Sequence, residues 1–173
     1  MHDPAKIDKP LIRVIDDDDA MRNSWAFLIE GEGWDVKTYA DAITFLSSND
    51  YIRPGCLLLD VRMPHMSGLE LQLKLREAGC DLPIIFISGH GDIDMAVNTL
   101  KAGAIDFLQK PVDDQRLLKT IENAVSHNLA QRRGKREVTD FRNRLESLTQ
   151  REREVIRMVA QGYSHKEDRK SVV

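Results

Sequence analysis

Short apolar runs alternate with amphipathic stretches five times between residues 11 and 125, and no other feature constrains the fold as strongly. The apolar runs are expected to form strands, because each is bounded by Gly, Pro or Asp; they are Leu11–Ile15, Trp34–Lys37, Cys56–Leu59, Pro83–Ile87 and Ile105–Leu108. The stretches between them have helical spacing; they are Met21–Glu30, Ala42–Ser48, Leu69–Ala78, Met95–Lys101 and a fifth stretch that begins after Pro111. Strands that alternate with helices form a parallel sheet with helices on both faces. The sequence therefore predicts an α/β fold with a doubly wound, five-stranded parallel sheet.

Composition excludes several other classes of protein. Of the 173 residues 42% are hydrophobic and the formal net charge is −3, which argues against disorder along the whole chain. The longest apolar runs, Cys56–Leu59 and Ile84–Ile87, are far shorter than the ~20 residues that a membrane-spanning helix needs. The polar segment 1–10 lacks the apolar core of a secretion signal, and Cys56 and Cys80 lie in apolar contexts that fit a reducing compartment. We therefore expect a cytoplasmic protein without a membrane partner.

Charge is distributed unevenly along the chain. Residues 1–127 contain 13 Lys and Arg against 21 Asp and Glu, whereas residues 128–173 contain 12 against 7. This asymmetry indicates an acidic domain followed by a basic appendage that can meet an acidic partner. The basic stretch Gln131–Arg136 fits a solvated helix face or a linker equally well, so charge alone leaves the role of the appendage open.

Groups suited to one kind of chemistry follow the predicted strands, at the ends where doubly wound folds bind ligands. They are Asp16–Asp19 after the first strand, Asp60 after the third, Ser88 after the fourth and Lys110 after the fifth. We expect Asp16, Asp17 and Asp60 to meet above the sheet edge, where neighbouring carboxylates repel one another and attract a cation. Oxygen ligands of this kind suit Mg²⁺. A divalent cation beside a free carboxylate, a hydroxyl and an ammonium group indicates a phosphoryl-transfer site in which the carboxylate attacks phosphorus.

Four segments carry a resemblance to a known family. They occur in order along the chain and are Val14–Asp18, Leu59–Gly68, Ile87–Asp92 and Asp106–Pro111. Together they resemble the motifs of two-component response-regulator receivers, over about residues 10–127. Two segments are most similar to the FixJ-like subgroup of the FixJ/NarL family: Arg62–Gly68 (RMPHMSG) and the stretch from Ser88 to Pro111. The resemblance implies a flavodoxin-like fold with strand order 2-1-3-4-5.

The resemblance also implies an acceptor and a metal site. Asp60 would be the phosphoacceptor. Mg²⁺, for which Mn²⁺ is a possible substitute, would be bound by Asp17, Asp60 and the backbone carbonyl of Arg62. Asp16 would reach the ion through water. These assignments rest on the motif positions and agree with the expected cluster of acids.

Three further positions match the family's switch and phosphoryl-binding residues. Ser88 and Lys110 would stabilise the phosphoryl group, and Ser88 with Phe107 would form the switch pair. Ser88 stands where Thr is frequent and keeps the hydroxyl, whereas Phe107 lacks the phenol of a Tyr switch, so its inward movement can rest only on apolar burial. Pro111 is expected to follow a cis peptide bond.

The resemblance further implies partners. A sensor histidine kinase would supply the phosphoryl group, and the protein would catalyse only its own phosphorylation and dephosphorylation. Phosphate would shift a two-state equilibrium toward a form that pairs through the face of Met95–Lys101, Ile105–Leu108 and the helix after Pro111. We expect a homodimer on phosphorylation, and promoter DNA as the target of a full-length relative.

After the receiver (10–127) we expect a helical linker over residues 128–147. The helical pattern continues through His127–Arg133, and Gly134 is expected to interrupt it. Apolar residues then recur at spacings of 3, 4 and 3, the heptad rhythm of a packing seam; they are Val138, Phe141, Leu145 and Leu148. Because two heptads are few for a coiled coil, the expectation is a short linker helix that can form a dimer.

Residues 148–173 resemble the start of a LuxR-type helix-turn-helix domain. Thr149–Glu152 form a capping box that opens a helix, which Gly162 is expected to end. The similarity extends through Glu167, and Asp168–Val173 lack the family's continuation, so the helix that reads bases in the major groove is missing. We therefore expect a truncated output domain and weak DNA binding or none.

Two other functions fit parts of the pattern. A magnesium-dependent phosphatase of the haloacid-dehalogenase type also uses an aspartate nucleophile, but its second aspartate, two residues later, is here Arg62. An interaction module that competes for kinase or dimer partners without binding DNA fits the missing DNA-reading helix. Specific binding to promoter DNA separates a transcription regulator from such a module.

Overall fold

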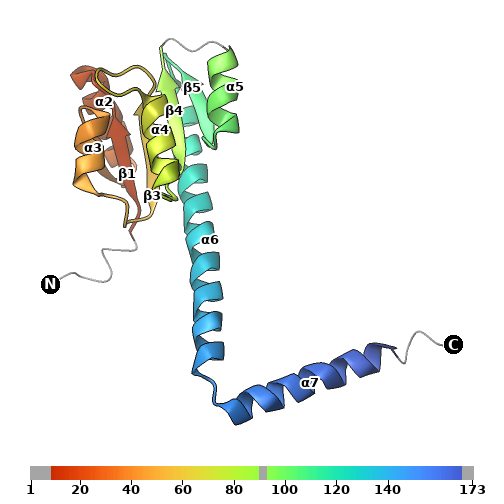
Figure 1. Cartoon of the computed structure of the whole chain (residues 1–173). Coiled ribbons are helices and arrows are strands. Elements are labelled where there is room, and N and C mark those ends of the chain that lie inside the picture. Colours follow the sequence, from red (N-terminus) through yellow and green to blue (C-terminus); the bar gives the residue numbers. More distant parts are fainter. Residues whose placement is uncertain (1–8, 90–92, 169–173) are drawn as a thin grey trace. The chain divides into compact units, whose positions relative to one another are not determined.

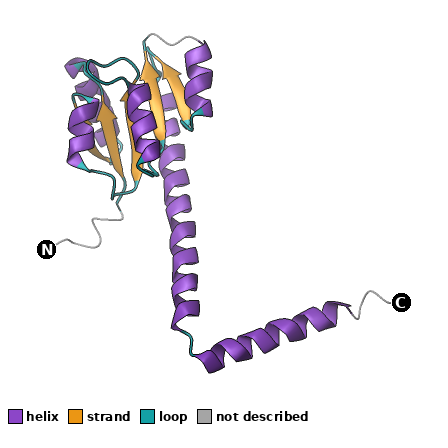
Figure 2. Cartoon of the chain, viewed as in Figure 1, coloured by secondary structure: helices purple, strands orange, loops and turns teal. Residues whose placement is uncertain are grey.

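The computed structural model describes residues 9–89 and 93–168, so His90–Asp92 of the third motif lie outside the described part. The chain divides into two compact units, one up to Gln131 and one from Arg132 onward. In the first unit five parallel strands form one sheet in the order β2-β1-β3-β4-β5 (Figure 2). The strands are β1 (Leu11–Ile15), β2 (Asp35–Tyr39), β3 (Gly55–Asp60), β4 (Ile84–Ser88) and β5 (Asp106–Gln109). The predicted strand order is confirmed.

A helix follows each strand, and the helices lie on both faces of the sheet (Figure 1). They are α2 (Asp19–Gly31), α3 (Ala42–Ser48), α4 (Gly68–Glu77), α5 (Ile93–Lys101) and α6 (Asp114–Ser147). The core has two halves because side chains along a strand point alternately to opposite faces. From β3, Leu57 and Leu59 pack with α3 and α4, whereas Cys56 and Leu58 pack with α2 and α6. The predicted doubly wound architecture is therefore confirmed.

The central strands approach one another closely at the amino end of β3. A Cβ atom on Gly55 would lie 1.9 Å from the carbonyl oxygen of Leu11 in β1, and the φ angle of +147° also favours glycine. Asn128, a fully buried residue of α6, accepts a hydrogen bond from the backbone N–H of Gly55 and donates one to the carbonyl of Asp81. One side-chain amide thus joins α6 to the start of β3 and to the segment before β4.

The helices of the C-terminal part are longer than the sequence predicts. Helix α6 continues without a break through Gly134 to Ser147, and α7 (Gln150–Asp168) continues past Gly162, so both predicted interruptions are wrong. A helical glycine costs only about 1 kcal/mol, and its neighbours here include favourable Gln, Arg, Lys and Glu residues. The capping box is confirmed, since the backbone N–H of Glu152 donates to the Thr149 hydroxyl and Glu152 accepts from the Thr149 N–H.

Across the described segments, no helix combines the length and the apolar character that crossing a bilayer requires. The domain bounds 10–127, 128–147 and 148–173 remain predictions.

Candidate functional site

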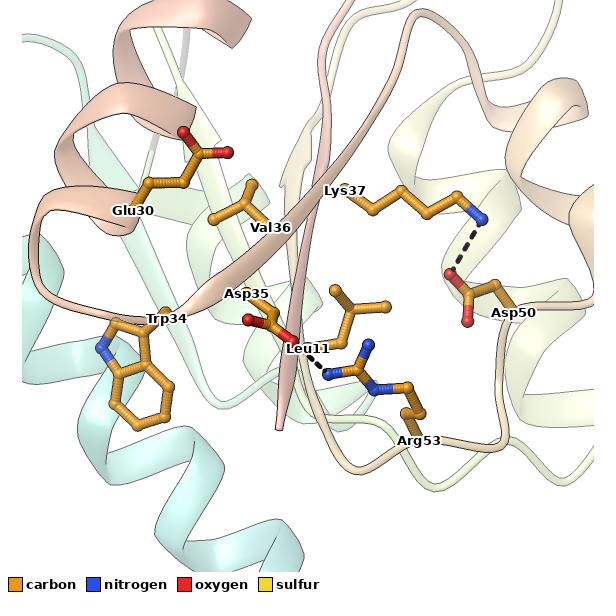
Figure 3. A pocket seen from close by; sticks show the side chains of 8 residues that line it. All are labelled: Leu11, Glu30, Trp34, Asp35, Val36, Lys37, Asp50 and Arg53. Carbon is orange, nitrogen blue, oxygen red and sulfur yellow. Dashed lines mark hydrogen bonds and ion pairs between the residues drawn. The ribbon is translucent and has the colours of Figure 1, made fainter. Parts of the chain in front are cut away.

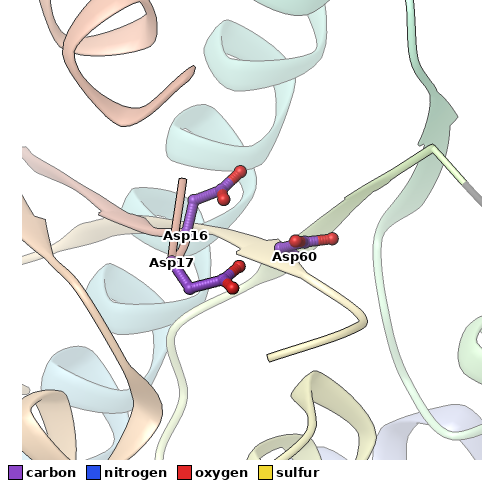
Figure 4. A group of neighbouring side chains, drawn as sticks. All are labelled: Asp16, Asp17 and Asp60. Atoms are coloured by element: carbon purple, nitrogen blue, oxygen red, sulfur yellow. The ribbon is translucent and has the colours of Figure 1, made fainter. Parts of the chain in front are cut away.

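Three carboxylates from two neighbouring strands meet at the carboxyl edge of the sheet (Figure 4). Asp16 and Asp17 follow β1, and Asp60 is the last residue of β3. Because β1 and β3 pair in parallel, with Ile15 opposite Leu59, their ends arrive at the same place. One oxygen from each carboxylate lies within 4.8 Å of the others. Residues 43 positions apart in the sequence therefore form a single acidic cluster, as the strand-end positions predict.

Asp16 is the buried member of the cluster and is held from three directions. One of its oxygens accepts a hydrogen bond from Lys110 Nζ at 3.0 Å, and the other accepts from the backbone N–H of Asp18 at 2.9 Å. Its backbone carbonyl accepts from the Arg22 guanidinium at 2.7 Å. These bonds fix Asp16, whereas Asp17 is exposed to solvent. The two adjacent aspartates are therefore not equivalent.

Burial is the main influence on Asp60 and raises its pKa above the usual aspartate value. The ammonium group of Lys110, 4.0 Å away, acts in the opposite direction and lowers the pKa. The negative charge of Asp16 raises it further, while the backbone N–H groups of Arg62 and Val61 lower it by hydrogen bonding to the carboxylate. The surroundings of Asp60 therefore disfavour its negative charge. A carboxylate in such surroundings is suited to bind a cation or to act as a nucleophile.

This raised pKa predicts how stability depends on pH. The folded state binds the Asp60 proton more tightly than the unfolded state, so ionisation of Asp60 destabilises the fold. The favourable contribution is complete below the unfolded pKa of about 3.9 and is lost as pH rises through the higher folded value. Asp60→Asn is therefore expected to raise the free energy of unfolding near neutral pH. Urea denaturation with a chelator present, at about pH 7 and about pH 4, measures this gain, which should shrink at the lower pH.

Ser88 and Lys110 lie next to the acids on neighbouring strands. In the β3–β4 register Asp60 stands opposite Ile87, so the buried Ser88, which ends β4, comes one residue further along. The backbone N–H of Lys110 donates to the carbonyl of Ser88 at 2.9 Å. The peptide bond between Lys110 and Pro111 is cis. A hydroxyl-bearing residue and an ammonium group thus accompany the acidic cluster at the same edge.

Phe107, the predicted switch aromatic, lies on β5 and is half-buried. Its ring centroid lies 6.4 Å from that of the buried Phe86, and the two rings are tilted by 33°. Phe107 packs against the half of the core that contains α3 and α4.

The loop after Asp60 contains a feature that sequence reasoning did not recognise as structural. The backbone N–H of Gly68 donates to the carbonyl of Val61 at 2.8 Å, and a Cβ atom on Gly68 would lie 2.3 Å from the carbonyl oxygen of Asp60. The loop therefore folds back against the strand end that carries the acid. Arg62, whose carbonyl is a predicted metal ligand, has an exposed side chain two residues beyond Asp60.

Sequence reasoning also missed Arg22 and the capping role of Asp18. The Asp18 side chain accepts from the backbone N–H of Met21 and so begins α2, a role that an aspartate directly before a helical pattern indicates. Arg22 lies one turn further along α2, and no local signal marks its bond to the carbonyl of Asp16. Both residues position the acids without belonging to the cluster.

A concave region lies at the opposite ends of the strands (Figure 3). It has a volume of about 580 Å³, and Leu11 and Asp35, the first residues of β1 and β2, are among the residues that line it. Four of its charged groups form two ion pairs: Arg53 with Asp35 at 2.8 Å and Lys37 with Asp50 at 3.4 Å. This region contributes nothing to the acidic cluster.

Comparison with known proteins places these observations in a family. The model of the response regulator receiver domain matches residues 12–122. The chain belongs to the response regulator receiver family. This membership places the chain among signalling proteins of two-component systems rather than among conventional enzymes.

Individual relatives define the type of response regulator. The chain is 43% identical over 157 residues to the response regulator protein TmoT of Ectopseudomonas mendocina, covering 91% of this chain and 71% of TmoT. It is 39% identical over 155 residues to the transcriptional regulatory protein FixJ of Rhizobium meliloti, covering 90% of this chain and 76% of FixJ. The solved structure of the response regulator StyR is 44% identical and superposes with a TM-score of 0.80, covering 89% of this chain and 78% of that one. The receiver is therefore of the FixJ/NarL type.

Proposed function

We propose that this receiver accepts a phosphoryl group from a sensor histidine kinase on Asp60, in a reaction that depends on Mg²⁺. The observation that carries the proposal is the convergence of Asp16, Asp17 and Asp60 with Lys110 at one edge of the sheet. The Asp60 carboxylate would attack phosphorus and form a P–O bond while the P–N bond to the phosphohistidine of the kinase breaks and the histidine leaves, and the Lys110 ammonium would neutralise charge on the transferred phosphoryl oxygens. The Ser88 hydroxyl would donate a hydrogen bond to one of these oxygens.

The donor set fits a magnesium ion, because all three groups offer carboxylate oxygens close to one another. Asp17, Asp60 and the carbonyl of Arg62 would hold the ion directly, and Asp16 would contact it through water. Mn²⁺ is a substitute with the same preference for oxygen ligands. When bound, the ion supplies charge neutralisation for the phosphoryl oxygens.

Reaction with acetyl phosphate tests this function directly. The full chain incubated with acetyl phosphate and Mg²⁺ should gain the mass of one phosphoryl group in intact mass spectrometry. EDTA added before the phosphodonor should prevent the gain. A chain that remains unmodified with Mg²⁺, or that is modified equally well with EDTA, would contradict the proposal.

Metal binding has its own expected result, which does not depend on phosphorylation. Mg²⁺ at about 100 times its dissociation constant should raise the free energy of unfolding by about 2.7 kcal/mol, because it binds the folded state only. Asp17→Asn should remove most of this gain. Asp19→Asn is the matched control, since Asp19 belongs to the same acidic run but lies in the first turn of α2, outside the cluster. Urea denaturation with and without Mg²⁺ measures both, and equal losses in the two variants would contradict the assignment.

The output of the switch is proposed from the relatives. Ser88 and Phe107 would couple the phosphoryl group to the face formed by α5, β5 and the first turns of α6, which would then pair as a homodimer. FixJ is named a transcriptional regulatory protein, and on this basis we propose transcription control as the output. In this proposal residues 10–127 are the receiver, residues 128–147 the linker and residues 148–173 a segment related to a LuxR-type output domain.

A further inference from the structure

Three apolar side chains on the second half of α6 are largely exposed. Val138, Phe141 and Leu145 expose 59%, 64% and 41% of their surface, respectively, and we call them the linker seam. They recur at spacings of 3 and 4 on one continuous helix, which places them on one side of it. The seam therefore forms a single apolar stripe, whose last member, Leu145, also borders a concave region that Ile156 and Ala160 of α7 line.

The helix that carries the seam has little else to stabilise it. Every residue from 133 to 147 is exposed, so this stretch of about four turns makes no core of its own. Isolated helices of this length are marginal in water, and helices in proteins obtain most of their stability from packing of an apolar face. Gly134 near its beginning lowers the helix propensity further. A partner on the seam would supply the missing packing.

The seam spacing defines a heptad register. A spacing of 3 leads from position a to position d and a spacing of 4 from d to a, so Val138 and Leu145 occupy a and Phe141 occupies d. The β-branched Val138 at a is of the type that favours two strands, whereas Leu145 at the second a and Phe141 at d do not add to this preference. In this register Glu137 is at position g, and Lys135 and Arg142 are at position e.

Charges beside the seam distinguish between two orientations of a second copy. In a parallel pair, position g of one helix faces position e of the next heptad of its partner, so Glu137 faces Arg142 with opposite charge. Symmetry creates this pair twice. In an antiparallel pair, g positions face one another and so do e positions. Glu137 would then face Arg144 with opposite charge, but the cations Lys135 and Arg142 would also be placed together. Charge complementarity therefore favours a parallel arrangement.

We propose that the linker seam binds a second copy of this chain as a short, parallel, two-stranded coiled coil. This interface is separate from the α5–β5–α6 face proposed for the phosphorylated form and requires no phosphoryl group. Because the seam lies away from the acidic cluster in sequence and belongs to the other unit, Asp60→Asn should leave this association unchanged. Failure of the coiled coil and failure of the phosphoryl chemistry are therefore distinguishable.

Sedimentation equilibrium of the unphosphorylated full chain, over the micromolar to millimolar range, tests the association. The wild type should shift from monomer to dimer as its concentration rises. Phe141→Glu should weaken the dimer about a hundredfold, because two large apolar side chains lose their burial. Asn143→Glu is the matched control: it adds the same charge at position f, on the side away from the seam, and should leave the dimer intact. A wild type that remains monomeric throughout, or equal effects of the two variants, would overturn the proposal.

Charge reversal tests the orientation. Glu137→Arg and Arg142→Glu should each weaken the dimer about fivefold, and the double variant should restore wild-type association. Restoration by Glu137→Arg with Arg144→Glu, but not with Arg142→Glu, would indicate antiparallel helices and overturn the parallel arrangement. Val138→Cys in a Cys80→Ala background gives a second readout, since a parallel pair in register brings residue 138 opposite itself while Phe141 stays in the seam. This variant should form a disulfide-linked dimer under mild oxidation, and a monomer under the same conditions would contradict the register.

Discussion

Asp60→Asn is expected to take up no phosphoryl group from acetyl phosphate under conditions that fully modify the wild type. The substitution keeps the shape of the side chain but replaces the attacking carboxylate with an amide, which is not a nucleophile. Neighbouring acids cannot replace it readily, because Asp16 is buried and its two oxygens already bind Lys110 and the Asp18 N–H. Intact mass spectrometry after reaction with acetyl phosphate and Mg²⁺ measures the loss.

Asp140→Asn is the matched control for this experiment. It makes the same chemical change at an exposed position of α6 in the other unit, and modification should proceed as in the wild type. Circular dichroism should show both variants folded, since Asp60→Asn is expected to stabilise the fold at neutral pH. Full modification of Asp60→Asn would exclude Asp60 as the acceptor and leave Asp17 as the accessible carboxylate of the cluster.

Gly55→Ala is expected to have the largest effect on folding. The added Cβ atom would lie 1.9 Å from the carbonyl oxygen of Leu11, and neither backbone can move without separating β1 from β3. Backbone strain at φ +147° adds to this clash. We expect a loss of about 4 kcal/mol or more in the free energy of unfolding, which is a large share of the total for a domain of this size. Urea denaturation, or loss of soluble protein on expression, measures this effect.

Gly31→Ala provides the control for Gly55→Ala. Gly31 ends α2, and a Cβ atom there meets nothing within 4 Å. The change should leave stability unaltered or raise it slightly, because alanine favours helix more than glycine does. If Gly55→Ala were as stable as Gly31→Ala, the close approach of β1 and β3 would be wrong. Magnesium binding should be lost together with the fold, since these two strands carry all three acids.

The alternating pattern predicts the strands of the first unit well because burial of apolar side chains determines where these strands lie. Each predicted strand lies within two residues of the observed one. Strands β1, β3 and β4 are buried on both sides, which fixes them in the sheet, whereas β2 at its edge exposes Lys37 and Thr38. Arg13, fully buried in the middle of β1, is an exception that the pattern does not explain. Its two terminal guanidinium nitrogens donate to the carbonyls of Leu11 and Arg53 and to Asp50, 37 residues away, and no local signal links Arg13 to that partner.

Prediction of the helices and of the site has different limits. Gly134 and Gly162 do not interrupt their helices, because one unfavourable residue weighs less than many favourable neighbours. The rule that parallel strands end at one edge is enough to predict that Asp16, Asp17 and Asp60 meet. It does not predict Asn128, because a lone amide on the apolar side of a helix gives no indication of its two backbone partners. Contacts between segments that are distant in sequence could not be predicted from the sequence pattern.

The four consecutive aspartates after β1 have consequences for how this gene tolerates change. Asp16 binds Lys110, Asp17 joins the acidic cluster, Asp18 caps α2, and Asp19 pairs with Arg22. Loss of one codon from this run would still leave an acidic stretch that looks intact when sequences are compared letter by letter. Three aspartates would nevertheless have to fill four positions, and one of the four tasks would have no side chain to perform it. The four aspartates are therefore not interchangeable. Deletion of one of them should be as harmful as substitution of a residue that occurs once.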